Sequence, residues 1–240
     1  MLYRYHTPKD HETIMTNRVI VIDIDETLVR TFDEDEDISY SNFKEIVDEL
    51  PLIAKSRIYQ FDLYDVIEGT RGKGDKMRMF GVIRPYVDEF LEFCFKYFQL
   101  VCVWSAGKPD YVDGICQTLF KDKSPHIVYT SEHCEERIKR GGKETIKPIE
   151  KMINMNSKQP SLEGLMRFDN TLCLDDREST FSENPKNGIL IPSWSPEPTV
   201  QSLMDNSDQA LHQLQHWLLE HKTGDVRNLH KNTIFDNVIL

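Results

Sequence analysis

The chain has 240 residues, of which 39% are hydrophobic and 10% aromatic, which is enough to bury one sizeable core. A formal net charge of −11 argues against a protein that coats nucleic acid or an anionic membrane, since both need a basic surface. The five cysteines include no CxxC pair, which argues against a disulfide framework or a thiolate zinc site and favours a reducing compartment. No apolar stretch approaches the roughly 18 residues of a membrane span, and the N-terminus lacks a signal-peptide core. We therefore expect a soluble intracellular protein, nuclear or cytoplasmic, with no membrane partner.

Most of the negative charge lies in one segment. Residues 33–49 carry eight acidic side chains and one lysine, whereas residues 71–78 and 137–147 are mainly basic. Such runs are most often solvated faces. If the protein has a site for an anionic substrate, the basic runs predict that the mouth of that site, its entrance, is locally positive. The acidic segment would then lie away from that mouth or select against extra negative charge in the substrate.

Short apolar runs alternate with helical patterns along the chain. Runs that are apolar on both faces predict buried strands. In chain order they are 19–22, 100–104, 127–130, 172–174 and 189–191. Before the second of them, alternating stretches at 58–67 and 76–83 flank a glycine-rich turn and predict an antiparallel hairpin.

Prolines mark the predicted helix starts between these strands. Pro85, Pro109 and Pro148 each precede a helical apolar pattern and fit a first helical turn. A last helix is capped by Ser207 or Asp208 and ends before Gly224.

Strand–helix alternation predicts an α/β fold, with a three-layer Rossmann-like parallel sheet, an inserted β-hairpin and no large cap. We divide the chain into an N-terminal extension (1–16), one domain (17–224) and a C-terminal tail (225–240). The tail ends apolar and would either dock back or bind a partner.

Paired acids follow the first strand in VIDIDETLV. Asp23 comes directly after the apolar run, where a carboxylate can act as a nucleophile, and Asp25 can serve as acid and base. Ligands bind at the carboxyl ends of strands in α/β sheets. The alternative is a loop acid that caps the following helix.

A second acidic pair, Asp175 and Asp176, follows another strand in LCLDDRE. Carboxylates converging from two strand ends need a cation, and Mg²⁺ bound by carboxylate, phosphate and water oxygens suits them. Ser105 begins a third strand-end element that suits phosphate binding. Lys147 could pair with Asp175 and neutralise phosphoryl oxygens, or be one more exposed lysine.

The ordered set VIDIDETLV, IRPYVDEFL, VWSAG, Lys147-Pro148 and LCLDDRE resembles the aspartate-nucleophile phosphatases of the haloacid dehalogenase superfamily. Within that superfamily the chain is similar to the RNA polymerase II C-terminal-domain phosphatases, also called NLI-interacting-factor-like phosphatases. The more specific part of the resemblance lies in residues 84–91, in residues 104–107 with Tyr111-Val112 following, and in the run NPKNGILIPSW. The resemblance covers roughly residues 17–222.

The resemblance implies a Mg²⁺-dependent phosphoserine/phosphothreonine phosphatase with a phosphoaspartate intermediate. The implied roles are nucleophile and metal ligand for Asp23, general acid/base and carbonyl metal ligand for Asp25, positioning for Thr27 and Ser105, phosphoryl clamp for Lys147, metal ligand for Asp176, and support from Asp175. Its implied partner is a phosphorylated protein, such as the RNA polymerase II tail. The first basic run supplies the predicted substrate-binding side chains Arg71, Lys73 and Arg78.

Two departures from the family pattern leave alternatives open. Asp176 stands where some members carry Asn, and either can bind a metal. The interval between Lys147 and Asp175 is long, so Lys151 and Lys158 are alternative lysines. The competing functions are a catalytically silent binding module of the same fold and a phosphatase for small molecules or polynucleotide ends.

Overall fold

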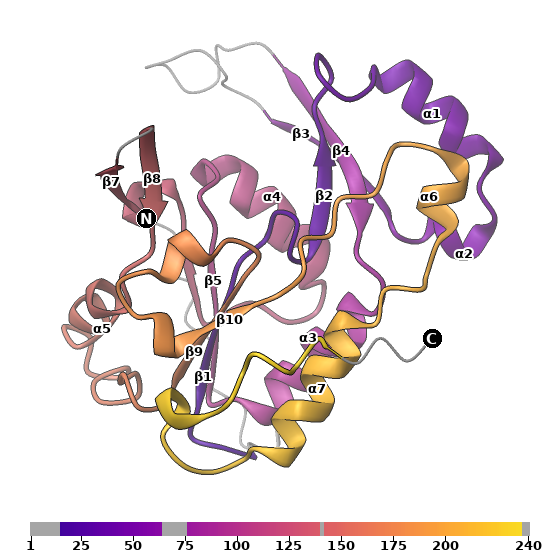
Figure 1. The fold of residues 1–240 in the computed structure, drawn as a ribbon. Helices are drawn as coiled ribbons and strands as arrows, with labels where there is room; N and C mark the ends of the chain where they lie inside the picture. Colours follow the sequence, from indigo (N-terminus) through magenta and orange to yellow (C-terminus); the bar gives the residue numbers. More distant parts are fainter. Residues whose placement is uncertain (1–14, 64–75, 140–141, 237–240) are drawn as a thin grey trace.

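A five-stranded parallel sheet forms the centre of the protein (Figure 1). The structure is a computed structural model that describes residues 15–63, 76–139 and 142–236. The strand order of the sheet is β10-β9-β1-β5-β6. The strands are β1 (Val19–Ile22), β5 (Leu100–Trp104), β6 (Ile127–Tyr129), β9 (Thr171–Asp175) and β10 (Gly188–Leu190). All five predicted strands are therefore confirmed, with ends that shift by one residue at β6, β9 and β10.

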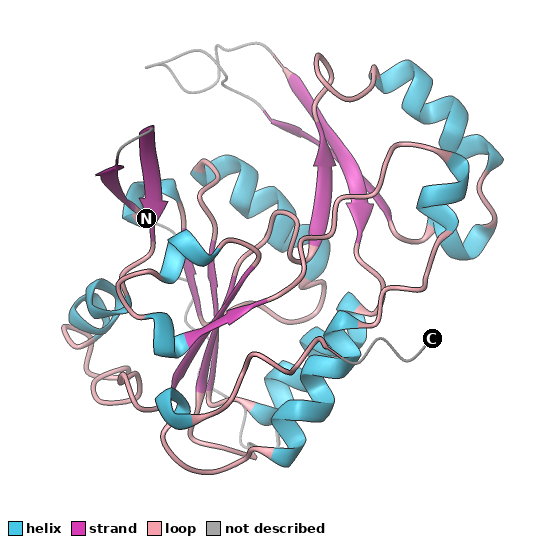
Figure 2. Cartoon of the chain, viewed as in Figure 1, coloured by secondary structure: helices cyan, strands magenta, loops and turns pink. Residues whose placement is uncertain are grey.

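Helices cover both faces of this sheet and make three layers (Figure 2). One face is covered by α3 (Val87–Tyr97), α4 (Pro109–Leu119) and α7 (Ala210–Glu220), and the other by α5 (Ile149–Asn156). Alternate side chains of β1 point to opposite faces, and all four are buried. This double burial explains why the strand is a continuous apolar run, and it confirms the predicted three-layer α/β fold.

The predicted hairpin is confirmed and belongs to a larger insert. The insert, which lies between β1 and α3 in the chain, contains a three-stranded antiparallel sheet of β2 (Val29–Phe32), β4 (Met77–Ile83) and β3 (Ile58–Leu63), with α1 (Tyr40–Glu49) and α2 (Leu52–Lys55). The later helix α6 (Val200–Met204) packs against it. The insert has its own small core, in which the Phe43 ring lies 5.3 Å from Phe32 and 4.9 Å from Phe80. Part of the acidic segment thus forms a helix, α1. The predicted glycine-rich turn at 69–74 lies outside the described residues.

A second hairpin, β7 (Glu135–Lys139) with β8 (Gly142–Ile146), contains most of the second basic run and was not predicted. Lys143 pairs with Glu136 across the hairpin, and Arg137 pairs with Glu183. These ion pairs compensate part of the positive charge of the run.

Helix starts follow the prolines less closely than predicted. Pro109 does occupy the first turn of α4, and Pro148 is the residue before α5. Pro85, however, lies two residues before α3, which begins after Tyr86 in a left-handed conformation (φ 65°). The residue before α7 is Gln209, not Ser207 or Asp208, and the Asp208 carboxylate forms an ion pair with buried Arg84. Four short 3₁₀ turns complete the described elements: Ser131–His133, Glu178–Phe181, Pro185–Asn187 and Val226–Asn228.

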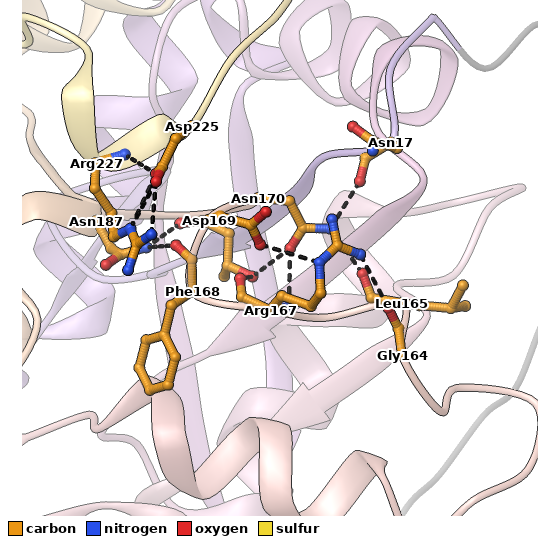
Figure 3. A network of polar contacts seen from close by, with 11 residues as sticks. Asn17, Gly164, Leu165, Arg167, Phe168, Asp169, Asn170, Asn187, Asp225 and Arg227 are labelled. Carbon is orange, nitrogen blue, oxygen red and sulfur yellow. Dashed lines mark hydrogen bonds and ion pairs between the residues drawn. The ribbon is translucent and has the colours of Figure 1, made fainter.

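A polar network joins the lower end of the sheet to the C-terminal segment (Figure 3). The Asn170 side-chain amide donates to the carbonyls of Asn17 and Leu165, which secures the start of β9 beside β1. Next to it, the Val226 backbone amide donates to the Asp169 carbonyl, and the Val226 side chain is fully buried. Residues 225–236 of the predicted tail therefore dock back onto the main core, where Ile234 is also buried.

All five cysteines are free thiols. Within the described part of the chain, no helix is both long and apolar enough to cross a bilayer.

Candidate active site

Three strand ends bring the predicted site residues to one edge of the central sheet. Asp23 follows β1 directly, Ser105 follows β5, and Asp175 ends β9. The Asp23 backbone amide donates to the Leu174 carbonyl at 2.9 Å, so that the first and third of these residues are held side by side. Parallel neighbours end at the same edge, which is why residues more than 150 positions apart meet here.

Lys147 lies between two of these carboxylates. Its Nζ donates to Asp23 Oδ1 at 2.5 Å and to Asp175 Oδ2 at 2.6 Å, and all three side chains are almost completely buried. Burial by itself lowers the pKa of Lys147, but the two carboxylates raise it above the ordinary lysine value. The ammonium therefore stays charged. The alternative lysines lie elsewhere, since Lys151 pairs with Glu135 and Lys158 is exposed.

The charge of this cluster fits a divalent cation. Carboxylate oxygens of Asp23, Asp175 and Asp176 all lie within 4.8 Å of one another. Three carboxyl groups, two of them buried, thus share the single Lys147 ammonium. Burial raises the pKa of Asp23, and Lys147 only partly opposes that effect. Hard oxygen donors at this spacing suit Mg²⁺, so the predicted ligands fit the ion.

Asp25 faces a different group of side chains. Ser105 Oγ donates to Asp25 Oδ2 at 3.3 Å, and the Tyr111 hydroxyl donates to Oδ1. Burial raises the pKa of Asp25, which the hydrogen bonds from Tyr111 and Ser105 oppose. Ser105 in turn accepts from the Gly107 backbone amide at 2.9 Å. The arrangement gives Asp25 a raised pKa and a fixed orientation, as a proton donor needs.

The loop that carries Asp25 is held mainly through its backbone. Glu26 adopts a left-handed conformation (φ 55°), and its carbonyl accepts from the Trp194 amide at 2.8 Å. The Thr27 carbonyl accepts from Arg84 Nη1 at 3.1 Å. The buried Thr27 hydroxyl has no hydrogen-bond partner among the described residues.

A cleft of about 660 Å³ opens beside Asp25. Its other walls come from the insert and the start of α4: Thr31, Phe32, Asp33, Glu34, Asp35, Leu63, Met77, Arg78, Met79, Lys108, Asp110 and Tyr111. Of the two alternatives for the acidic segment, a position away from the mouth does not hold for residues 33–35, which line the cleft. Both acidic and basic side chains therefore line the cleft.

The predicted substrate-binding residues are only partly placed. Arg78 lines the cleft, but its guanidinium bonds to Asp62 at 2.9 Å and lies over the Tyr40 ring. Arg71 and Lys73 lie outside the described residues. Exposed Lys108, which no motif singled out, is a second cation on the wall.

Sequence reasoning also missed the partners of Asp25. No motif assigns a role to Tyr111, although its place in the first turns after a strand-end serine is a usable signal. Thr31 and Tyr59, which continue the hydrogen bonding from Tyr111, lie on the insert strands. No linear spacing connects them to the site.

Comparisons with known proteins identify the family of the chain. A family model described as NLI interacting factor-like phosphatase matches residues 18–227. The chain belongs to this family. The predicted family and its haloacid-dehalogenase-like fold are thus confirmed, and the family is one of phosphatases.

One solved structure supports the fold, and a second is similar over much of the chain. The chain is similar to Fcp1, described as an essential RNA polymerase II CTD phosphatase, with a TM-score of 0.59 and 12% identity. That match covers 88% of this chain and 68% of the other. A fission yeast Fcp1 variant bound to beryllium fluoride matches with a TM-score of 0.49 and 14% identity, over 89% and 59% of the two chains. Among curated proteins, no sequence matches.

Proposed function

We propose that the chain is a Mg²⁺-dependent phosphoserine/phosphothreonine protein phosphatase that works through a phosphoaspartate. The observation that carries the proposal is the buried contact of Lys147 with Asp23 and Asp175, set beside Asp25 at the edge of the sheet. Five free thiols agree with the intracellular compartment, nuclear or cytoplasmic, that we propose with it.

In the first step, a carboxylate oxygen of Asp23 attacks phosphorus, and the bond from phosphorus to the serine or threonine oxygen breaks. Asp25 gives its proton to the departing oxygen. Lys147 keeps Asp23 oriented and compensates charge on the phosphoryl oxygens. Ser105 binds and positions the phosphoryl group. A bound Mg²⁺ would be held by Asp23, Asp176 and the Asp25 carbonyl, with Asp175 in support, and supplies further charge compensation.

In the second step, water attacks the phosphorus of the phosphoaspartate. Asp25 takes a proton from that water, the bond to the Asp23 oxygen breaks, and inorganic phosphate leaves. Asp25 is thereby reprotonated for the next cycle, so the two carboxylates have different tasks. Their surroundings differ accordingly, since Asp23 contacts an ammonium and Asp25 contacts hydroxyl groups.

The cleft supports a protein substrate over a small metabolite. Its volume of about 660 Å³ and its apolar side chains Leu63, Met77 and Met79 can take residues that flank a phosphorylated side chain. Fcp1 is described as a phosphatase of the RNA polymerase II C-terminal domain, so repeats of that domain are the first substrate to test.

Phosphate release from phosphopeptides, a nucleotide and a 3′-phosphorylated oligonucleotide, each with Mg²⁺ or with chelator, tests the proposal. We expect Mg²⁺-dependent release that favours phosphopeptides and that Asp23→Asn abolishes. Glu163→Gln, an exposed acid, is the matched control. Turnover that survives in Asp23→Asn would overturn the mechanism. No turnover at all, together with binding of an unphosphorylated peptide, would instead favour a silent binding module.

A further inference from the structure

A chain of three hydroxyl groups, those of Tyr111, Thr31 and Tyr59, leads from Asp25 into the insert and forms a hydrogen-bond relay. Tyr111 of α4 donates a hydrogen bond to Asp25 Oδ1. The Thr31 hydroxyl of β2 lies 2.5 Å from the Tyr111 hydroxyl and 2.5 Å from that of Tyr59 on β3. Three separate elements thus converge on one carboxyl group.

Counting protons gives these hydrogen bonds a direction. Each hydroxyl has one proton to donate, and an ionised carboxylate has none. Since Tyr111 donates to Asp25, its oxygen accepts from Thr31, and the Thr31 oxygen then accepts from Tyr59. Burial raises the pKa of both phenols, which therefore keep their protons. Successive hydrogen bonds of this kind polarise and strengthen one another.

The relay also distinguishes the two oxygens of Asp25. Oδ1 accepts a hydrogen bond from the Tyr111 hydroxyl. Oδ2 lies 3.3 Å from the Ser105 hydroxyl. The two hydroxyl groups thus hold different oxygens of one carboxyl group and fix its orientation, with Oδ2 beside the residue that we assign to phosphoryl binding.

Two glycines make room for the relay. A Cβ at Gly107 would lie 2.6 Å from a ring carbon of Tyr111. A Cβ at Gly81 would lie 2.5 Å from the Tyr59 hydroxyl and 2.2 Å from a backbone oxygen. Both rings thus occupy space that any other residue at these glycines would fill.

We propose that Tyr111, held by Thr31 and Tyr59, is a positioning residue that fixes the orientation of the Asp25 carboxyl group, with Oδ2 on the side of Ser105. The inference rests on the proposed function, because it requires Asp25 to act as the general acid. It gives the insert a part in the reaction beyond lining the cleft, since two of the three hydroxyl groups come from its strands.

The test compares two leaving groups. A serine alkoxide needs a proton as it departs, whereas p-nitrophenolate is stable without one. We expect Tyr111→Phe to lower kcat/KM for a phosphoserine peptide at least about tenfold, and that for p-nitrophenyl phosphate only about twofold or less. Thr31→Val should act in the same direction, and the double variant should lose little more than Tyr111→Phe alone, because both interrupt one chain.

Tyr97→Phe is the matched control, because Tyr97 is buried and its hydroxyl donates to the Leu218 carbonyl far from the relay. It removes a buried hydroxyl without changing the ratio of the two rates. If Tyr111→Phe lowers both rates equally, or neither, the relay is wrong while the phosphatase stands. If the wild-type chain hydrolyses neither substrate, the proposed function itself has failed. Thermal unfolding of each variant separates lost folding from lost positioning.

Discussion

At the scale of single residues, Lys147 carries the charge balance of the site. Its ammonium separates the Asp23 and Asp175 carboxylates, each about 4% exposed. In Lys147→Met these carboxylates would face each other without compensation. We expect loss of turnover and a free energy of unfolding lower by about 3–5 kcal/mol at neutral pH without Mg²⁺. Urea unfolding measures the second effect, with exposed Lys158→Met as control. An unchanged unfolding midpoint in Lys147→Met would contradict the buried contact.

Asp176 is the residue through which metal binding can be tested separately from folding. It is half-buried beside Asp23 and Asp175, and it forms no contact with Lys147 that would be lost with it. Mg²⁺ at ten times its dissociation constant should stabilise the wild-type chain by about 1.4 kcal/mol. Asp176→Ala should lose this gain, and Glu178→Ala, an exposed acid two residues on, should keep it. Thermal unfolding at several Mg²⁺ concentrations decides between these outcomes.

At the scale of elements, the loop between β2 and α1 brings the acidic residues 33–35 to the cleft. Asp33 Oδ1 accepts backbone hydrogen bonds from Asp35 and Glu36, so amide substitutions remove the charge and keep an acceptor for the turn. We expect the combined change D33N, E34Q and D35N to raise activity on a doubly phosphorylated peptide relative to a singly phosphorylated one about three- to tenfold.

The control for this change neutralises three exposed acids on the adjoining helix, E45Q, D48N and E49Q, which alters the net charge equally. If both triple variants change the ratio alike, only the overall charge matters. If neither changes it, the acidic segment has no role in selection.

Some elements could be predicted from the sequence and others could not. The strands of the central sheet are covered on both faces, so each is an apolar run that local composition reveals. β2 (VRTF) and the hairpin β7–β8 carry polar residues on their open side and have no such signature. The helix α1 fully buries only Phe43, and its other apolar side chains, Tyr40, Ile46 and Val47, pack on the insert core while partly exposed.

For the whole molecule, the segment after α7 packs on the main core. Val226 is fully buried, Ile234 is 5% exposed, and Arg18 next to β1 donates to the Thr223 carbonyl at 2.8 Å. We propose that the domain extends to about residue 236 rather than ending at 224. Lys231 secures the segment through hydrogen bonds to the carbonyls of Lys186 and Val226.

Lys231 makes the docking of this segment sensitive to pH. Burial, together with repulsion from the positive charge of nearby Arg18, lowers its pKa to about 8. A lysine in the unfolded chain has a pKa of about 10.4. Between these two values the unfolded chain binds more protons, so the contribution of Lys231 to stability rises with pH. The free energy of unfolding of the wild type relative to Lys231→Met should therefore increase from pH 7 to pH 10. The same difference for Lys222→Met, at an exposed lysine, should not rise with pH. If the difference for Lys231→Met does not change with pH, Lys231 is not in the buried environment described above.

The parallel sheet, the family and the acids that follow the strands can be predicted from the sequence, because burial on both faces and acids at strand ends are local patterns. Asp23, Asp25, Asp175 and Asp176 are predicted in this way. Which lysine lies between the carboxylates depends on the tertiary structure, because a flexible side chain 28 residues before Asp175 has no fixed spacing from it. The same holds for the acidic segment, whose net charge is visible in composition while its place on the cleft wall depends on how the insert packs. The net charge of −11 argues against a nucleic-acid coat, and the fold places part of that charge beside the proposed catalytic acid.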